Sequence, residues 1–213
     1  ADPTYVNKTS GKAEIHANAD GTVIRYNGVV LDGEDAKNYK LYYKIGDNAP
    51  TALTGTNLDL KGTITRRRIT TNDFKVYEQG TNAAVEATKT YDGNDIYDPT
   101  KLNPPKSVYL STDENGTTGI VSRDQGHITF AMKDGKGKFN TKHVKGASTI
   151  SYTVTGVADD KTDTDGSRLY RLSDYYVDVG GTQKNLEEEF AASGAGKITP
   201  KALTATVVNQ HIT

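Results

Sequence analysis

The sequence contains one segment twice, as GTITRRRIT at residues 62–70 and as GKITPKALT at residues 196–204. Gly62 and Gly196 open the two copies and lie 134 positions apart. The isoleucine, the two threonines and the large aliphatic residue that follow keep the same spacing in both copies. Five positions that share one spacing indicate a tandem repeat. Each copy has the pattern of a strand that ends one unit, a sharp junction, and a strand that opens the next.

The repeat period predicts how the chain is divided. It gives the C-terminal part of one unit, a complete unit and the start of a third, at residues 1–68, 69–202 and 203–213. TYVNK at 4–8 matches KFNTK at 138–142 with the same offset. We therefore expect a first module at 1–68, with a boundary between about residues 65 and 85, and a second module at 69–213.

The composition favours β-structure. The chain has 13 Tyr, and its 21 Gly supply turns, whereas Cys is absent, which excludes disulfides and thiol chemistry. Lys+Arg number 26 and Asp+Glu 27, so the near-neutral charge argues against a nucleic-acid partner. No apolar run has the length of a membrane span, so we expect no membrane partner. Because Ala1-Asp2-Pro3 resembles an expression-vector remnant and no signal peptide is present, we expect targeting signals outside this chain.

The strongest alternation of apolar and polar residues lies at 149–157, where Ile150, Tyr152 and Val154 share one face. We expect two all-β modules, each an antiparallel β-sandwich of immunoglobulin-like shape, arranged in tandem, end to end. The segment LEEEFAA at 186–192 is the one stretch with helical character, and it leaves a second possibility. That alternative is a β-grasp-like sheet packed on this short helix.

Three motifs together resemble the YDG-type repeats, and the similar MBG-type repeats, that occur in tandem in large bacterial surface proteins and adhesins. The motifs are KTYDGN at 89–94, GKFNTK at 137–142 and ITPKALT at 198–204. The first junction departs from the pattern, because Arg66-Arg67 stands in place of Pro200-Lys201. The resemblance implies an extracellular module at the bacterial cell surface, without enzymatic activity, whose partners are neighbouring repeats of the same chain.

Two functions are compatible with such a module. The first is a non-catalytic stalk or spacer that extends an adhesin tip from the cell. The second is a binding module for a host ligand, such as a glycoprotein, a mucin glycan or an immunoglobulin. No Ser/His/Asp motif, phosphate-binding glycine loop or Cys nucleophile is present, so we expect that the chain is not an enzyme.

Tyr91-Asp92-Gly93 is either a ligand site or a turn. A motif that recurs in every unit of an array usually serves the fold. We therefore predict a structural turn, in which Asp92 caps backbone N–H groups, Gly93 has positive φ and Tyr91 packs.

Adjacent tyrosines are the candidates for binding. In a strand, neighbouring side chains point to opposite faces, so one tyrosine of each pair faces outward unless it is covered. Exposed tyrosines supply contact area at little entropic cost. The candidates are Tyr42, Tyr43, Tyr175 and Tyr176, and the alternative is that they belong to the core or to a contact with a neighbouring domain.

The loop DDKTDTDG at 159–166 is the candidate cation site. An EF-hand is excluded, because Lys161 and Leu172 stand where that loop needs acidic ligands. Either calcium binds at the loop carboxylates of Asp160, Asp163 and Asp165, or the loop is simply solvated. We expect no other cofactor.

Overall fold

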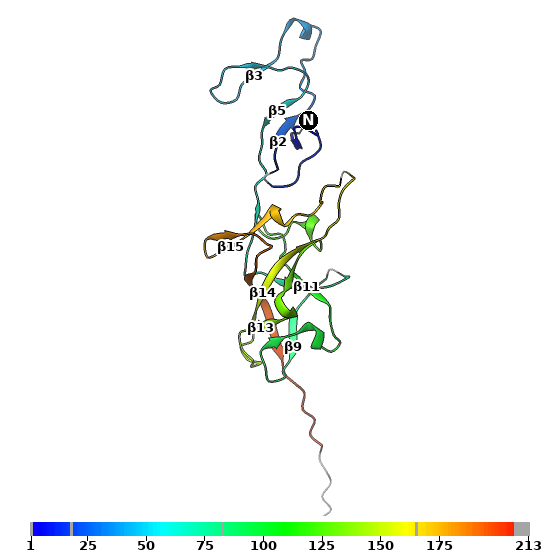
Figure 1. Ribbon diagram of the computed structural model, residues 1–213, viewed down its shortest axis with the longest axis vertical. Coiled ribbons are helices and arrows are strands. Elements are labelled where there is room, and N and C mark those ends of the chain that lie inside the picture. The colour runs from blue at the N-terminus through cyan, green and yellow to red at the C-terminus, as the bar shows by residue number, and fades with distance from the viewer. Residues whose placement is uncertain (1, 18, 82, 165, 207–213) are drawn as a thin grey trace, which may run out of the picture. The chain divides into compact units, whose positions relative to one another are not determined.

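The structure is a computed structural model that describes residues 2–17, 19–81, 83–164 and 166–206. The chain divides into two compact units, unit 1 at residues 1–66 and unit 2 at residues 67–213 (Figure 1). Strands β1 to β17 and five short 3-10 helices form its regular structure, and the described residues contain no α-helix. The all-β class expected from the composition is therefore confirmed.

Unit 1 contains an antiparallel three-stranded sheet, in the order β1-β2-β5, and a separate pair of short strands, β3 and β4. Its elements are β1 Thr4–Asn7, β2 Thr22–Tyr26, η1 Ala36–Asn38, β3 Tyr42–Tyr43, β4 Thr51–Ala52 and β5 Leu58–Lys61. Arg25 of β2 pairs with Asp59 of β5, and its Nε and Nη2 atoms lie 2.7 and 2.8 Å from the two carboxylate oxygens. This bidentate ion pair favours the observed register of β2 and β5.

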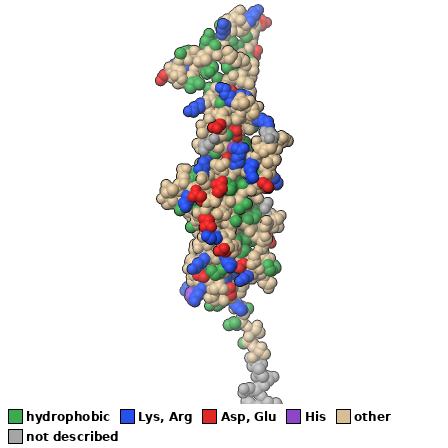
Figure 2. Space-filling model, in the orientation of Figure 1, with side chains coloured by type: hydrophobic (Ala, Val, Ile, Leu, Met, Phe, Trp, Pro, Cys, Tyr) green, Lys and Arg blue, Asp and Glu red, His purple; other side chains and the backbone are tan. Residues whose placement is uncertain are grey.

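Unit 1 has very little core. Among its described residues only Val6 and His16 are buried. Its exposed large hydrophobic side chains are those of Tyr5, Ile15, Val30, Leu31, Tyr39, Tyr42 and Ile45. Figure 2 shows hydrophobic side chains on the surface of this unit. Tyr5 is paired in one row with Ile24 and Leu60, which are half-buried, so the apolar face of the three-stranded sheet that carries these residues is only partly covered.

Most of unit 2 is one curled sheet, a half-barrel with the strand order β10-β13-β14-β12-β11-β7-β8. Strand β17 pairs with β14 and also lies parallel to β9, while a smaller sheet has the order β16-β15-β6. The strands are β6 Arg67–Ile69, β7 Lys75–Glu78, β8 Ala83–Val85, β9 Ala87–Thr90, β10 Ile96–Tyr97, β11 Val108–Ser111, β12 Ile128–Met132, β13 Gly137–Phe139, β14 Thr149–Ala158, β15 Tyr175–Val179, β16 Thr182–Lys184 and β17 Phe190–Thr199. The 3-10 helices are η2 Pro99–Lys101, η3 Ser122–Asp124, η4 Lys133–Gly135 and η5 Leu172–Asp174.

A cluster of aromatic rings lies inside the curled sheet of unit 2. Phe74 and Phe130 meet edge to face with ring centroids 5.0 Å apart, and Phe190 lies 5.8 Å from Phe130 in the same geometry. Edge-to-face contacts of this kind stabilise a core beyond simple area burial. The rings come from β12, β17 and the residue before β7, so the cluster joins the first half of unit 2 to its last strand.

Strand β14 confirms the alternation expected at 149–157, because Ile150, Tyr152 and Val154 are buried and the residues between them are not. The helix expected at 186–192 is wrong. Residues 186–188 form a turn, and β17 begins at Phe190, which pairs with Val154. Pairing along β14 and burial of the Phe190 ring outweigh the weak helical preference of this short segment. The β-grasp alternative, which needed that helix, is wrong for the same reason.

Candidate functional site

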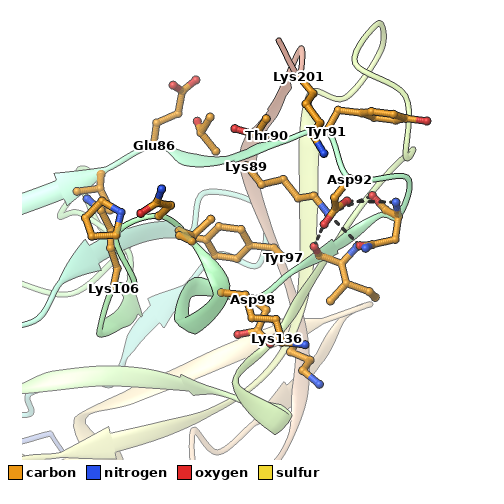
Figure 3. Close-up of a pocket in the computed structure, with 18 residues that line it drawn as sticks. Glu86, Lys89, Thr90, Tyr91, Asp92, Tyr97, Asp98, Lys106, Lys136 and Lys201 are labelled. Carbon is orange, nitrogen blue, oxygen red and sulfur yellow. Dashed lines mark hydrogen bonds and ion pairs between the residues drawn. The ribbon is translucent and has the colours of Figure 1, made fainter. Parts of the chain in front are cut away.

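A hollow in unit 2 surrounds the Tyr-Asp-Gly turn. It has a volume of about 880 Å³ and is open to solvent. Strands β9 and β10, helix η2 and the loop that follows η2 form its walls, and Lys136 and Lys201 also line it (Figure 3). The phenol of Tyr97 lies at its floor, where burial raises the pKa of that side chain.

Lys89 is the central side chain of this hollow. It is only 5% exposed, because the alternation of β9 directs Lys89 and Ala87 to the buried face. Its Nζ donates hydrogen bonds to the side-chain oxygen of Asn94 at 2.9 Å, to the carbonyl of Asn94 at 3.1 Å and to the carbonyl of Ile96 at 2.9 Å. The carboxylate of Asp92 lies 2.6 Å from the same Nζ. The ammonium is thereby both paired and hydrogen-bonded, as a buried charge must be.

The turn itself is built around Asp92 and Gly93. The backbone amide of Asn94 donates to the Asp92 carboxylate at 3.2 Å, and Gly93 has a φ of +90°. Partial burial acts to raise the pKa of Asp92, but the hydrogen bonds from Lys89 and the Asn94 amide outweigh it and lower that pKa. The backbone amide of Tyr91 donates to the carbonyl of Thr199 at 2.8 Å and so ties the turn to β17.

The side chain of Tyr91 behaves differently from its neighbours. It is 37% exposed, and Figure 3 shows its ring pointing away from the floor of the hollow. Lys201 also lines this hollow. Asp92 and Gly93 therefore shape the backbone, while Tyr91 presents a partly exposed ring at the edge of the hollow.

The tyrosines singled out as binding candidates occupy different environments in the two units. Tyr42 of β3 is 54% exposed and Tyr43 is half-buried. In unit 2, Tyr175 is a core residue whose hydroxyl donates to Asp124 at 2.8 Å, and Tyr176 is half-buried. Burial raises the pKa of Tyr175, and the hydrogen bond to Asp124 raises it further. Tyr42 is thus the member of the set with the largest exposed ring.

The calcium candidates lie in the loop between β14 and η5. Asp160 and Asp163 are exposed, and Asp165 lies outside the described residues. Asp163 takes part in a backbone turn, in which its amide donates to Ser167 and its carbonyl accepts from Gly166. No group of three metal-ligating side chains gathers within the described ranges. The three-aspartate site stays a prediction, because one of its members is not described.

A second, smaller hollow of about 310 Å³ was not expected from the sequence. The rings of Tyr77 and Tyr109 stack there with centroids 5.4 Å apart, and Tyr77 and Lys75 both donate hydrogen bonds to Asp113. These bonds lower the pKa of Asp113, with the bond from Lys75 contributing most. The burial of Lys89 was also missed, although its place two residues after Ala87 in a strand could have revealed it.

Comparisons with known proteins place the chain in no group. No protein-family model matches it, and neither the curated proteins nor the solved structures include a significant match. Among the described residues, no helix is long and apolar enough to cross a membrane. On the face seen in Figure 2, basic and acidic side chains lie interspersed.

Proposed function

We propose that the chain is a non-catalytic spacer from a tandem array, of the kind that extends an adhesin from the bacterial cell surface. The observation that carries this proposal is the repetition of one strand arrangement in both units. Strands β1, β2 and β5 pair as β13, β14 and β17 do, and each arrangement leads into a copy of the repeated junction. A chain that repeats a structural unit, junction included, adds length with every copy.

The first and the last strand of unit 2 each lie parallel to another strand of the unit, and this arrangement suits a module that carries tension. Strand β6 lies parallel to β15, and β17 lies parallel to β9 from Gly196 to Thr199. A force applied through the chain at the C-terminal end of β17 loads the bonds to β9 along the strand direction. The bonds then resist together, whereas strands that are pulled apart from one end lose their bonds one after another.

Force spectroscopy on single molecules tests this function. Since the chain has no cysteine, the pulling handles attach only at cysteines introduced by substitution. Thr65→Cys with Lys201→Cys pulls unit 2 along its natural direction, and Tyr91→Cys with Lys201→Cys peels β9 from β17. We expect a clearly higher rupture force for the first pair, since forced unfolding is governed by the unfolding rate along the pulled direction. Equal forces for the two pairs would contradict a load-bearing role.

The immunoglobulin-like shape expected of the modules is also part of this proposal. We infer that the complete module is a variant of an immunoglobulin-like sandwich, in which the curled sheet of unit 2 supplies both layers around the phenylalanine cluster. Two features support it, the antiparallel pairing of most strands and a core enclosed by one curling sheet. An experimental structure of a chain with two complete modules would decide the point.

A binding module is the second candidate, and the exposed ring of Tyr91 beside the large hollow favours it. A partly exposed tyrosine ring at such an edge suits contact with a host glycoprotein, a mucin glycan or an immunoglobulin. The test is a screen of the purified chain against glycans, mucin and immunoglobulins, repeated with Tyr91→Ala. Binding that Tyr91→Ala abolishes, with the stability of unit 2 unchanged, would support this function over the spacer.

A further inference from the structure

We propose that unit 1 is the second half of a module, and that its apolar face and one strand edge bind a first half of the same repeat. The occupant is a segment with the chemistry of residues 67–137, which fill this place in unit 2. The proposal rests on the repeat and not on the spacer function, so a failed force measurement leaves it intact.

The first support is the register of two sets of three strands, β1-β2-β5 and the β13-β14-β17 part of the larger sheet. In each set a row of directly paired residues crosses the three strands, with Tyr5, Ile24 and Leu60 in unit 1 and Phe139, Ile150 and Gly194 in unit 2. Tyr5 and Phe139 lie 134 positions apart in the sequence, and so do Leu60 and Gly194, which is the period of the repeat. Sequence spacing and strand pairing therefore agree that β1-β2-β5 corresponds to β13-β14-β17.

The second support is the packing of the repeated glycine. A Cβ added to Gly62 would lie 2.8 Å from Cγ1 of Ile24. A Cβ added to Gly196 would lie 3.1 Å from Cβ of Ile150 and 2.8 Å from Cε1 of Phe139. In both units the chain at this glycine, directly after β5 in unit 1 and within β17 in unit 2, thus passes close to the equivalent isoleucine, which only glycine permits.

The third support is the difference in burial at these equivalent places. Phe139 is 2% exposed, whereas Tyr5, its counterpart, is 42% exposed. Ile198 is buried, whereas Ile64 in the other copy of the junction is only half-buried. The cover over Phe139 comes from the first half of unit 2, where the ring of Tyr97 meets it edge to face at 6.1 Å. Unit 1 has the equivalent sheet face, which carries Tyr5, but its described residues place no aromatic ring over Tyr5 as Tyr97 is placed over Phe139.

The fourth support is the strand edge. In unit 2 the residues from Gly196 to Thr199 pair with β9, a strand of the first half. The equivalent residues in unit 1, Gly62 to Thr65, have no strand partner in the described part of the chain. The outer edge of β1 is different, because residues 12–14 already bond to it. The docking edge is therefore the one at 62–65.

The lengths of the middle strands agree with this inference. Strand β14 has 10 residues, and its second part pairs with β12 from the first half of unit 2. Strand β2 has 5 residues and ends at Tyr26. The hydrophobic residues that follow it, Val30 and Leu31, are exposed. Strand β2 stops where a β12-like neighbour would be needed to continue it.

An extended chain tests the proposal. It carries a second copy of residues 69–137 joined directly to Thr4, because Lys138 is the residue that corresponds to Thr4. Amide hydrogen exchange is measured at 62–65 in the original and the extended chain. We expect exchange at these amides to slow by about tenfold or more in the extended chain, because they enter a parallel ladder.

The matched control has the same extended length but cannot pack. It carries Phe74→Ala and Phe130→Ala in the added copy alone, and should leave exchange at 62–65 as fast as in the original chain. Equal protection by both added copies, or none by either, overturns the proposal. An added copy that stays unfolded beside an unchanged unit 1 overturns it as well. Protection at 62–65 that arises in the original chain as it dimerises would assign the edge to a second copy, and so also overturn it.

Discussion

Two sets of three strands with the same register lie in this chain, and one packs on a large core while the other has very little core. In unit 2 the strand β14 alternates between buried and exposed residues, whereas every residue of its counterpart β2 is half-buried. The strands pair equivalently and differ in what lies above them. Register is thus set by neighbouring strands and by the turn segments, but burial is decided by chain segments far away in the sequence.

The comparison also separates two kinds of stabilisation. Unit 1 relies on a polar cross-strand contact, the bidentate Arg25–Asp59 pair. Unit 2 relies on apolar packing, with 19 buried residues in a single cluster in the described part of the chain. Ion pairs near the surface contribute little to the free energy of unfolding, whereas buried aromatic rings contribute much. The stabilities of the two units should therefore respond very differently to equivalent substitutions.

The largest difference should come from Phe139→Ala against Tyr5→Ala, which truncate equivalent side chains. Loss of the buried Phe139 ring should lower the free energy of unfolding of unit 2 by about 3–5 kcal/mol. Loss of the exposed Tyr5 ring should change unit 1 by less than about 1 kcal/mol. Urea unfolding followed by NMR, which reports each unit separately, measures both. Similar losses in the two units would break the comparison.

Lys89→Met is expected to have the next largest effect, and to confine it to unit 2. The substitution keeps the length of the side chain but leaves the carbonyls of Asn94 and Ile96 without their donor, which should cost about 1–3 kcal/mol. Lys136→Met is the matched control, because Lys136 lines the same hollow but is exposed. Thermal unfolding measures both, and an equal shift for the two variants would show that Lys89 has no special role.

Acid should weaken both units through carboxylates whose pKa is lowered by folding. The hydrogen bond from Arg25 lowers the pKa of Asp59 in unit 1, and in unit 2 the bonds to Asp92 outweigh its burial and lower its pKa. A lowered folded pKa gives stability that is present above the ordinary value of 3.8 and is lost as the pH falls through the folded value. Asp59→Asn should flatten the pH dependence of unit 1 alone, and Asp92→Asn that of unit 2 alone. The measurement is the urea midpoint of each unit across the acid range. A variant whose unit keeps the pH dependence of the original chain would refute the prediction.

The smallest effect is expected from calcium, which concerns a loop that unit 2 has and unit 1 lacks. If Asp160, Asp163 and Asp165 bind the ion, millimolar calcium should slow proteolysis within 158–173 and leave the unfolding temperature of both units nearly unchanged. Asp160→Asn should remove the protection. Proteolysis that is insensitive to calcium in the original chain would remove the site.

The sequence predicted those features that depend on local pattern or on the repeat. The β-class, the alternation of β14 and the turn at Asp92-Gly93 all follow from residues close together in the chain. The equivalence of Tyr5 with Phe139 came from the period and is supported by strand register. Each of these predictions rests on the alternation of side chains, on glycine conformation or on the repeat, and none of them requires knowledge of distant contacts.

The features that the sequence did not predict depend on distant partners. The segment at 186–192 is helical by preference, but from Phe190 onward it forms the start of β17 because β14 offers it a partner. The burial of Lys89 depends on Asn94 and Ile96 closing over it. The uncovered state of unit 1 was also missed, because the segments that would cover its strands lie far away in the sequence.

The parallel pairing of β9 with β17 has a consequence for how the chain folds as it is made. Gly196 pairs with Ala87, so unit 2 closes only after nearly all of its residues have been synthesised. Until then β9 lacks the strand with which it pairs in the folded unit, while a copy of that strand's junction, at 62–65, has already been made. Contacts between segments so distant in sequence form slowly, and tandem repeats are prone to exchange of equivalent strands. The differences between the two copies, Thr63 against Lys197 and Arg66 against Pro200, are therefore candidates for the residues that direct β9 to the correct edge.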